Sequence, residues 1–306
     1  MLRLARLYYV EGISQNQLAK REGISKATVS RMLSLARENG FVTITVNDGL
    51  RDANVLASQL HELYPEVQFT VVPTFQNNRS TILDKVALST ANYLDDLVKN
   101  GDIIGFGSSE ALKMIANHLT SKNVRDVVVL SLTGIIANSD CEAFAYETGD
   151  KLAHAYQTKA SFLPLPVVFD DVAAKELVEK EVLIRHLEKL GRLANIALIS
   201  LDSIEDSPFL NQMNYFKDEQ KQALTEAAVG DVLGHFIDAN GAVVDPDLDE
   251  RVVTTSLNNL KQKEHSIAAV HNVETVPTLK AALNAGYCNQ VFIDQYSAQV
   301  LLDSHA

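Results

Sequence analysis

Short apolar segments alternate with helical periods from about residue 53 to the end of the chain, and this alternation restricts the possible folds more than any other feature. The strand-like segments are 67–72, 102–106, 126–132, 160–169, 195–201, 266–271 and 290–294. The helical periods lie near 52–63, 79–99, 141–157, 172–190, 275–285 and 295–303. Such an order is typical of a largely parallel β-sheet with helices on both faces. We therefore expect an α/β fold for residues 53–306.

Three turns follow strand-like segments at their carboxyl ends, where open parallel sheets bind ligands. They are GFGSSEA (105–111), LTGI (132–135) and HNVET (271–275). The first has the layout of a phosphate cradle, because a helix that begins after it would direct free N–H groups at the turn. The pattern leaves three interpretations open: the cofactor loop of an enzyme, the ligand pocket of a sensor, or a connection that binds nothing.

The sequence offers little for catalysis. The dinucleotide fingerprint G-x-G-x-x-G lacks its third glycine, and no nucleophile elbow or Cys/His nucleophile pair is present. Two cysteines cannot form a disulfide framework, and eight scattered histidines show no metal-ligand spacing. We expect no cofactor and no metal. No apolar run is long enough for a membrane helix, and no signal peptide is evident, so we expect a cytoplasmic protein.

Charge is distributed unevenly along the chain. Residues 1–45 carry seven basic and three acidic side chains, a net charge of +4, and the chain's net charge of −12 therefore leaves −16 for the rest. A basic segment joined to an acidic body indicates that only the segment meets a polyanion. A solvated basic surface is the simpler alternative, which charge alone does not exclude.

The basic segment contains three predicted helices. The first ends near Gly12 and has an apolar face of Leu2, Leu4, Leu7, Tyr8 and Val10. Ser14 and Ser25 are positioned to cap the second and third helices, and Gly23 supplies the left-handed residue of a sharp turn between them. These spacings predict a helix-turn-helix DNA-binding domain over 1–46, with a strand or wing at 41–46 and a linker at 47–52.

The third helix would enter the major groove of DNA, because Val29 and Met32 point inward and leave its other face exposed. Arg31 can donate two hydrogen bonds to a guanine edge, and the Thr28 methyl group suits a thymine methyl. The predicted DNA-binding residues are Ser14, Gln15, Gln17, Lys20, Ser25, Lys26, Ala27, Thr28, Ser30 and Arg31. Plain surface solvation is the alternative for each.

Eight segments carry a resemblance to the SorC family of sugar-responsive bacterial transcription regulators, closest to its deoxyribonucleoside-regulator branch. They are ARLYY (5–9), SQNQLA (14–19), TVSRML (28–33), FLPLPVVFD (162–170), ANIAL (194–198), AVGD (228–231), FIDANG (236–241) and IDQYSA (293–298). The resemblance covers nearly the whole chain. It implies a helix-turn-helix module plus a large Rossmann-like effector domain of the isomerase/CoA-transferase type, over 53–306. This domain would bind a phosphorylated sugar, control oligomerisation and set the affinity for operator DNA.

The predicted effector site departs from the family pattern. Family members carry G-V-S-W-G-x-T where this chain has GFGSSEA, and the deoxyribose branch carries a lysine where Thr133 stands. Threonine cannot form a Schiff base with a sugar aldehyde. The family's Gly-Gly-x-x-Lys becomes His271–Thr275, which removes a cation and adds Glu274. The site is therefore less attractive to a dianion.

Retained groups still offer hydrogen bonds to a ligand. The predicted effector-binding residues are Gly105, Gly107, Ser108, Ser109, Thr133, Gly134, Asp238, His271, Asn272, Thr275 and Asp294. Asp238 is equally a turn former in DANG. Three states stay open: a phosphosugar held by helix dipoles, an uncharged sugar or nucleoside, or no ligand.

These features favour a DNA-binding repressor of a nucleoside or sugar catabolic operon, controlled by an effector such as deoxyribose 5-phosphate. A dimer or tetramer is expected, because one helix-turn-helix reads only a half-site. The expected partners are operator DNA, a small effector (sugar phosphate, sugar or nucleoside) and further copies of the chain. The enzyme alternative, a sugar-phosphate isomerase or aldolase, would need a base or Schiff-base lysine at the pocket strands. A regulator that works without a ligand is the third possibility.

Overall fold

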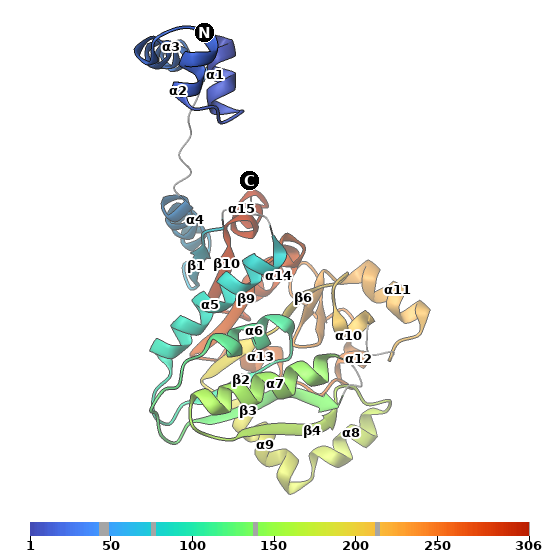
Figure 1. The fold of residues 1–306 in the computed structure, drawn as a ribbon. Helices are drawn as coiled ribbons and strands as arrows, with labels where there is room; N and C mark the ends of the chain where they lie inside the picture. Colours follow the sequence, from blue (N-terminus) through green and yellow to red (C-terminus); the bar gives the residue numbers. More distant parts are fainter. Residues whose placement is uncertain (43–48, 75–77, 137–139, 212–214, 306) are drawn as a thin grey trace. The chain divides into compact units, whose positions relative to one another are not determined.

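The computed structural model describes residues 1–42, 49–74, 78–136, 140–211 and 215–305 (Figure 1). The chain forms two compact units, Met1–Asp48 and Gly49–Ala306. The strand predicted at 41–46 lies almost entirely outside the described residues. The linker predicted at 47–52 is partly helical, because α4 (Gly49–Leu63) begins inside it.

The first unit consists of α1 (Leu2–Tyr9), α2 (Gln15–Glu22) and α3 (Lys26–Glu38). Ser14 and Gln17 form a capping box at α2, and Ser25 accepts a hydrogen bond from the Thr28 N–H at α3. Gly23 ends α2 with φ at 66°. The core contains Leu4, Ala5, Leu7, Leu18, Val29, Leu33 and Ala36. The predicted face of α1 was partly wrong, because Leu2 and Val10 are exposed.

A seven-stranded parallel sheet organises the second unit, in the order β1-β10-β9-β5-β2-β3-β4. The strands are β1 (Gln68–Val72), β2 (Ile103–Phe106), β3 (Val128–Ile136), β4 (Ala160–Pro166), β5 (Ile196–Ile199), β9 (His265–Val270) and β10 (Gln290–Asp294). The sheet order reverses between β2 and β5, which creates the kind of switch point where α/β sheets bind ligands.

Helices cover both faces of this sheet (Figure 1). One face packs on α5 (Arg79–Leu97), α6 (Glu110–His118) and α7 (Asp140–Ala155), and the other on α4, α9 (Val182–Leu193), α14 (Val276–Ala285) and α15 (Gln295–Asp303). Along β5, Ile196 and Leu198 enter the first core, whereas Ala197 and Ile199 enter the second. This alternation follows from the two-residue repeat of a strand buried on both sides.

The helical period predicted near 172–190 is two helices, α8 (Val172–Glu179) and α9. The break falls at Lys180–Glu181, where Glu181 takes an extended conformation. The two helices differ in what they bury, because α9 packs Ile184 and Leu187 into a core while α8 has no fully buried residue.

A small antiparallel sheet, absent from the sequence-based prediction, continues from the end of β5. It contains β6 (Leu201–Ser203), β7 (Gly230–Val232) and β8 (His235–Ile237). Short helices accompany it: α10 (Pro208–Asn211), α11 (Asp218–Ala227), α12 (Pro246–Asp249) and α13 (Leu257–Leu260); a 3-10 turn, η1 (Val273–Thr275), follows β9. Phe209, Phe216 and Phe236 pack together beside it. This sheet faces the carboxyl ends of the main strands, because β6 follows β5 after a single residue.

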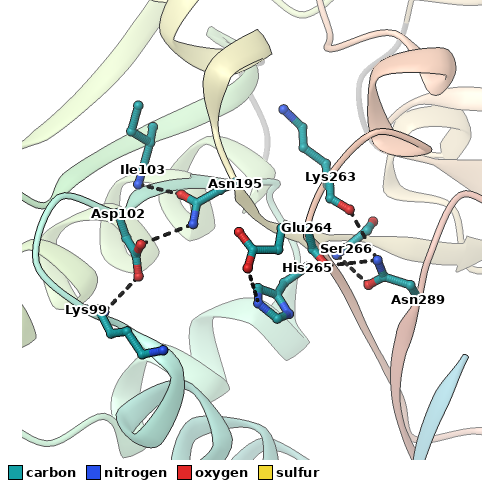
Figure 2. A network of polar contacts seen from close by, with 9 residues as sticks. All are labelled: Lys99, Asp102, Ile103, Asn195, Lys263, Glu264, His265, Ser266 and Asn289. Atoms are coloured by element: carbon teal, nitrogen blue, oxygen red, sulfur yellow. Dashed lines mark hydrogen bonds and ion pairs between the residues drawn. The ribbon is translucent and has the colours of Figure 1, made fainter.

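Side-chain amides organise the amino edge of the main sheet (Figure 2). Asn195 accepts a hydrogen bond from the Ile103 N–H at 2.9 Å and donates one to Asp102 at 3.1 Å. Asn289 accepts from the Ser266 N–H at 2.9 Å and donates to the backbone oxygens of residues 263 and 264. These bonds satisfy backbone groups at the starts of β2 and β9 and fix the register of neighbouring strands.

Candidate functional site

Three adjoining cavities lie at the carboxyl edge of the main sheet. The inner cavity, of about 40 Å³, lies between β3 and the small sheet. The central cavity, of about 370 Å³, lies beyond β2, β5 and β9. The outer cavity, of about 250 Å³, lies beyond β9 and β10. The inner and central cavities share Ser200, Asp202 and Pro208, and the central and outer ones share Arg79, His271 and Asn272.

Several polar side chains at these cavities also cap the elements that carry them. Ser109 accepts a hydrogen bond from the Leu112 N–H at 3.2 Å, which begins α6. Asn272 accepts hydrogen bonds from the Thr275 N–H at 2.9 Å and hydroxyl at 2.7 Å. Asp294 accepts from the Tyr296 and Ser297 N–H groups at the start of α15. Their positions are therefore set by local sequence, and part of their hydrogen-bonding capacity is already used.

Arg79 brings positive charge to the central and outer cavities from the first turn of α5. Its guanidinium donates to the Asp206 carboxylate at 3.1 Å, so part of that charge is neutralised inside the site. Burial, and then the charge of Arg79, lowers the pKa of His271 to about 4. His271 is therefore neutral at pH 7 and adds a hydrogen-bonding ring without a charge.

The inner cavity contains two acidic side chains, Asp202 and Asp231, at its boundary with the small sheet. Thr133, Gly134 and Ser108 line it from β3 and from the turn after β2, and Phe209 closes it with an apolar ring. A Cβ at Gly134 would approach the Pro166 carbonyl oxygen to 2.6 Å, so a glycine is required where β3 meets β4. Carboxylates beside small polar residues can accept hydrogen bonds from hydroxyl groups.

The structure brings eight of the eleven predicted effector residues to these cavities. They are Ser108, Thr133 and Gly134 at the inner cavity; Ser109, His271, Asn272 and Thr275 at the central cavity; and Asp294 at the outer cavity.

The other three line none of the cavities. Gly105 lies within β2, where a Cβ would overlap the Leu132 side chain, and its role is close packing. Gly107 extends the pairing of β2, because its N–H donates to the Leu198 carbonyl oxygen at 2.9 Å. Asp238 accepts from the N–H groups of Asn240 and Ala242 in the turn after β8, and these bonds lower its pKa. The turn-former alternative therefore describes its geometry.

Sequence reasoning missed Arg79, Ser200, Asp202, Asp231 and Phe209. Asp202 and Asp206 follow a predicted strand in SLDSIED, so their position after its carboxyl end was a usable signal. Nothing local marks Arg79, which reaches the site because α5 begins beside β9 and β10. Within the described parts of the chain, no group of three or more His, Cys, Asp or Glu side chains is arranged to hold a metal ion.

In the first unit, α3 presents Lys26, Ala27, Ser30 and Arg31 to solvent. Thr28 is half-buried, and its hydroxyl lies 2.8 Å from the Ser25 hydroxyl. On α2, Lys20 is exposed and Gln15 is half-buried, whereas Ser14 and Gln17 bond to one another in the capping box. The residues exposed on α3 are therefore different from Ser14, Gln17 and Ser25, whose side chains cap the helix starts.

No described helix is both long and apolar enough to cross a membrane.

Comparison with known proteins gives concordant results along the chain. The family described as "Putative sugar-binding domain" matches residues 49–303. The Deoxyribonucleoside regulator of Bacillus subtilis (strain 168) is 36% identical over 299 residues, which cover 98% of this chain and 96% of the relative. The Sorbitol operon regulator of Klebsiella pneumoniae is 23% identical, and the alignment covers 99% of this chain and 97% of the relative.

Solved structures show the same fold. The full-length sorbitol operon regulator SorC from Klebsiella pneumoniae superposes with a TM-score of 0.73 at 22% identity, covering 98% of this chain and 97% of that one. A domain of a possible sugar-binding transcriptional regulator from Arthrobacter aurescens TC1 has a TM-score of 0.74 at 26% identity, covering 82% of this chain and 97% of that one. These relatives are named regulators and not enzymes. The chain therefore belongs to the SorC family of transcriptional regulators with a sugar-binding domain.

Proposed function

We propose that this chain is a sequence-specific DNA-binding repressor of a nucleoside or sugar catabolic operon, with its operator affinity set by a small sugar or sugar phosphate such as deoxyribose 5-phosphate. The observation that carries the proposal is the combination of two parts in one chain. One is a capped three-helix unit with an exposed basic helix face, and the other is a group of cavities at the switch point of an α/β sheet.

The DNA-binding part of the proposal rests on α3. Its exposed residues Lys26, Ser30 and Arg31 lie opposite the buried Val29 and Leu33, so one face packs while the other is available to base edges. Arg31 supplies a planar pair of donors suited to guanine. Lys20 on α2 supplies a point charge suited to a phosphate. The DNA-binding residues predicted from the sequence remain part of this proposal.

The effector part rests on the chemistry of the cavities. Asp202, Asp231, Ser108 and Thr133 offer acceptors and donors for sugar hydroxyl groups in the inner cavity. A sugar phosphate would place its anionic end best in the central cavity, which is lined by the N-terminus of α6 and by Arg79, whose charge Asp206 partly neutralises. A relative that is named a deoxyribonucleoside regulator favours deoxyribose 5-phosphate and nucleosides among the candidates.

Effector binding changes operator affinity only by the difference in its affinity for the two arrangements of the protein. We further propose a dimer or tetramer, since two helix-turn-helix units on one operator occupy half-sites about 34 Å apart or a multiple of that spacing. The chain's acidic second part disfavours direct contact with DNA, which leaves recognition to the first unit.

The test is a selection of bound sequences from a random duplex DNA library by the full chain, followed by titration of the enriched site with candidate effectors. The panel contains deoxyribose 5-phosphate, free deoxyribose and deoxyribonucleosides. We expect enrichment of paired half-sites and a change of at least about tenfold in operator affinity with one panel member, which corresponds to about 1.4 kcal/mol of coupling. Failure to enrich any sequence would contradict the DNA-binding role. Enrichment without any effector response would contradict the sugar-responsive role.

A further inference from the structure

Two carboxyl groups stand opposite one another at the floor of the inner cavity. Asp202 on β6 and Asp231 on β7 are direct partners in an antiparallel pair, and both line the cavity. Directly opposed residues of such a pair project to the same face of the sheet, with their Cβ atoms about 4.5–5.5 Å apart. Two ionised carboxylates at that spacing repel one another strongly, because Asp231 is buried and Asp202 is only partly exposed.

The two groups differ in the hydrogen bonds that they receive. Asp231, which is 3% exposed, accepts from the Ser207 hydroxyl at 2.6 Å and from the Gly234 N–H at 3.0 Å, one bond on each oxygen. The Asp202 carboxyl group accepts no hydrogen bond from any other described residue, although it faces both the inner and the central cavities. Donors stabilise a carboxylate and leave an unassisted neighbour to hold the proton.

The surrounding charges also favour Asp202 over Asp231 as the carboxyl group that holds a proton. The titratable and charged groups around the pair are Asp206 in the turn after β6, Arg79 on α5, Glu110 on α6, His235 on β8 and His271 after β9. Arg79 is already paired with Asp206, and His271 is neutral at pH 7. Burial, then the charges of Asp231 and Asp206, raises the pKa of Asp202 well above its ordinary value. Burial also raises the pKa of Asp231, but Ser207, Gly234 and His235 oppose that shift.

We propose that the Asp202–Asp231 pair holds one proton, carried by Asp202, and that the Asp202 O–H donates a hydrogen bond to a hydroxyl or carbonyl oxygen of the sugar effector. This inference rests on the function proposed above and specifies the end of the ligand that enters the inner cavity. That end is neutral and oxygen-rich, because Asp231 accepts from one ligand hydroxyl while Asp202 donates to another oxygen. Effector binding is consequently linked to the retention of one proton.

The proton can be tested without any ligand. In the unfolded chain an aspartate titrates near pH 4, roughly its model value. Because the folded pKa of Asp202 is raised, the folded state binds the extra proton, and its stability falls as pH rises from that value towards the folded pKa. Asp202→Asn removes this titration and keeps a similar shape. We therefore expect the melting temperature of Asp202→Asn, relative to the unsubstituted chain, to increase as pH rises above about 4 and to level off once the folded pair has lost its proton.

Asp150→Asn is the matched control, since Asp150 is exposed on α7 and no hydrogen bond or ion pair joins it to either member of the pair. Its difference in melting temperature should stay constant over the same pH range. A constant difference for Asp202→Asn as well would overturn the shared proton. If Asp202→Asn does not fold, infrared spectroscopy of the unsubstituted chain decides the matter. A protonated-carboxyl band that persists well above about pH 4, where ordinary aspartates have ionised, supports the proposal, and its absence contradicts it.

The donor role is tested with deoxyribose 5-phosphate and free deoxyribose as probes, using the full chain. The phosphate of the probe titrates near pH 6 and would itself make binding depend on pH. The informative quantity is therefore the Kd of Asp202→Asn divided by the Kd of the unsubstituted chain, measured at each pH. The asparagine keeps an N–H donor, whereas the unsubstituted chain loses its donor once the proton leaves. We expect affinity relative to Asp202→Asn to fall by up to about tenfold per pH unit above the pKa of the pair. Asp202→Ala should bind weakly at every pH.

The outcomes separate this inference from the proposed function. Binding of a probe with a ratio that does not depend on pH overturns the donor role and leaves the sugar-responsive function intact. If no probe binds, the proposed effector class and the donor role both fall, while the thermal series still decides whether the pair holds a proton.

Discussion

Arg31 and Lys20 provide a test of DNA recognition at the scale of single residues, because both are exposed basic side chains on adjacent helices of the first unit. Arg31→Ala should cost about 1–3 kcal/mol of discrimination between the selected operator and a site changed at one base pair. Lys20→Ala should weaken binding to both sequences equally and reduce the salt dependence by about one phosphate contact. Fluorescence anisotropy with the two duplexes at several salt concentrations measures both effects. Unchanged discrimination by Arg31→Ala would refute its assignment to a base edge.

The residues that sequence analysis placed correctly are those whose role is local. Ser14, Gly23 and Ser25 cap or end helices within three or four positions of themselves, and the structure confirms them in these roles. Arg79 and Asp202 reach the cavities from segments more than 100 residues apart. No local sequence pattern shows that such distant segments meet. The polar turns were therefore predicted to line the site, whereas Arg79 and Asp202 were not.

At the scale of elements, two glycines in different environments should respond oppositely to alanine. A Cβ at Gly230 on β7 would overlap the Asp202 carbonyl oxygen and the Thr278 hydroxyl, so Gly230→Ala should destabilise the protein by about 1–3 kcal/mol. A Cβ at Gly191 on α9 would lie 3.7 Å from Leu132, an ordinary contact, so Gly191→Ala should stabilise it by up to about 1 kcal/mol. Urea unfolding of both variants measures the difference. Equal effects in the same direction would contradict the packing described for β7.

The main sheet could be predicted from the sequence because its strands carry continuous apolar runs between helices. Pro164 and Pro166 in β4 fit this scheme, since β4 is an edge strand where missing N–H groups are tolerated. The small sheet could not be predicted, because three-residue strands such as β7 and β8 are too short for a periodic pattern. Their existence depends on pairing with β6, which follows β5 directly. The sequence consequently predicted the side of the inner cavity formed by β3 and missed the side formed by the small sheet.

At the scale of the whole molecule, the two compact units should behave as separate folding units. The described apolar core of the first unit is formed by its three helices, the turns between them and the segment that follows, and the main cores of the second unit lie within 53–302. A fragment of residues 49–306 should therefore unfold at the temperature of the corresponding transition in the full chain. It should also keep any effector response in thermal shift and lose operator binding. A lower unfolding temperature for the fragment, measured by calorimetry, would contradict this independence.

The charge difference between the units operates at the same scale. Residues 1–45 carry a net positive charge that attracts DNA, and the remainder of the chain carries a larger negative charge that DNA repels. Under the proposed function, an effector signal would therefore reach DNA through the first unit, since the negative charge of the second unit disfavours its contact with the operator.

The amides at the amino edge of the main sheet have a consequence for how this protein can change over generations. Asn195 and Asn289 hold the strand starts together at one edge (Figure 2). The residues that line the inner cavity lie at the opposite edge, where the strands end. Substitutions that alter ligand preference therefore leave the strand-start amides untouched. Substitutions in the cavity turns can therefore change what the cavities bind while the scaffold keeps its alignment.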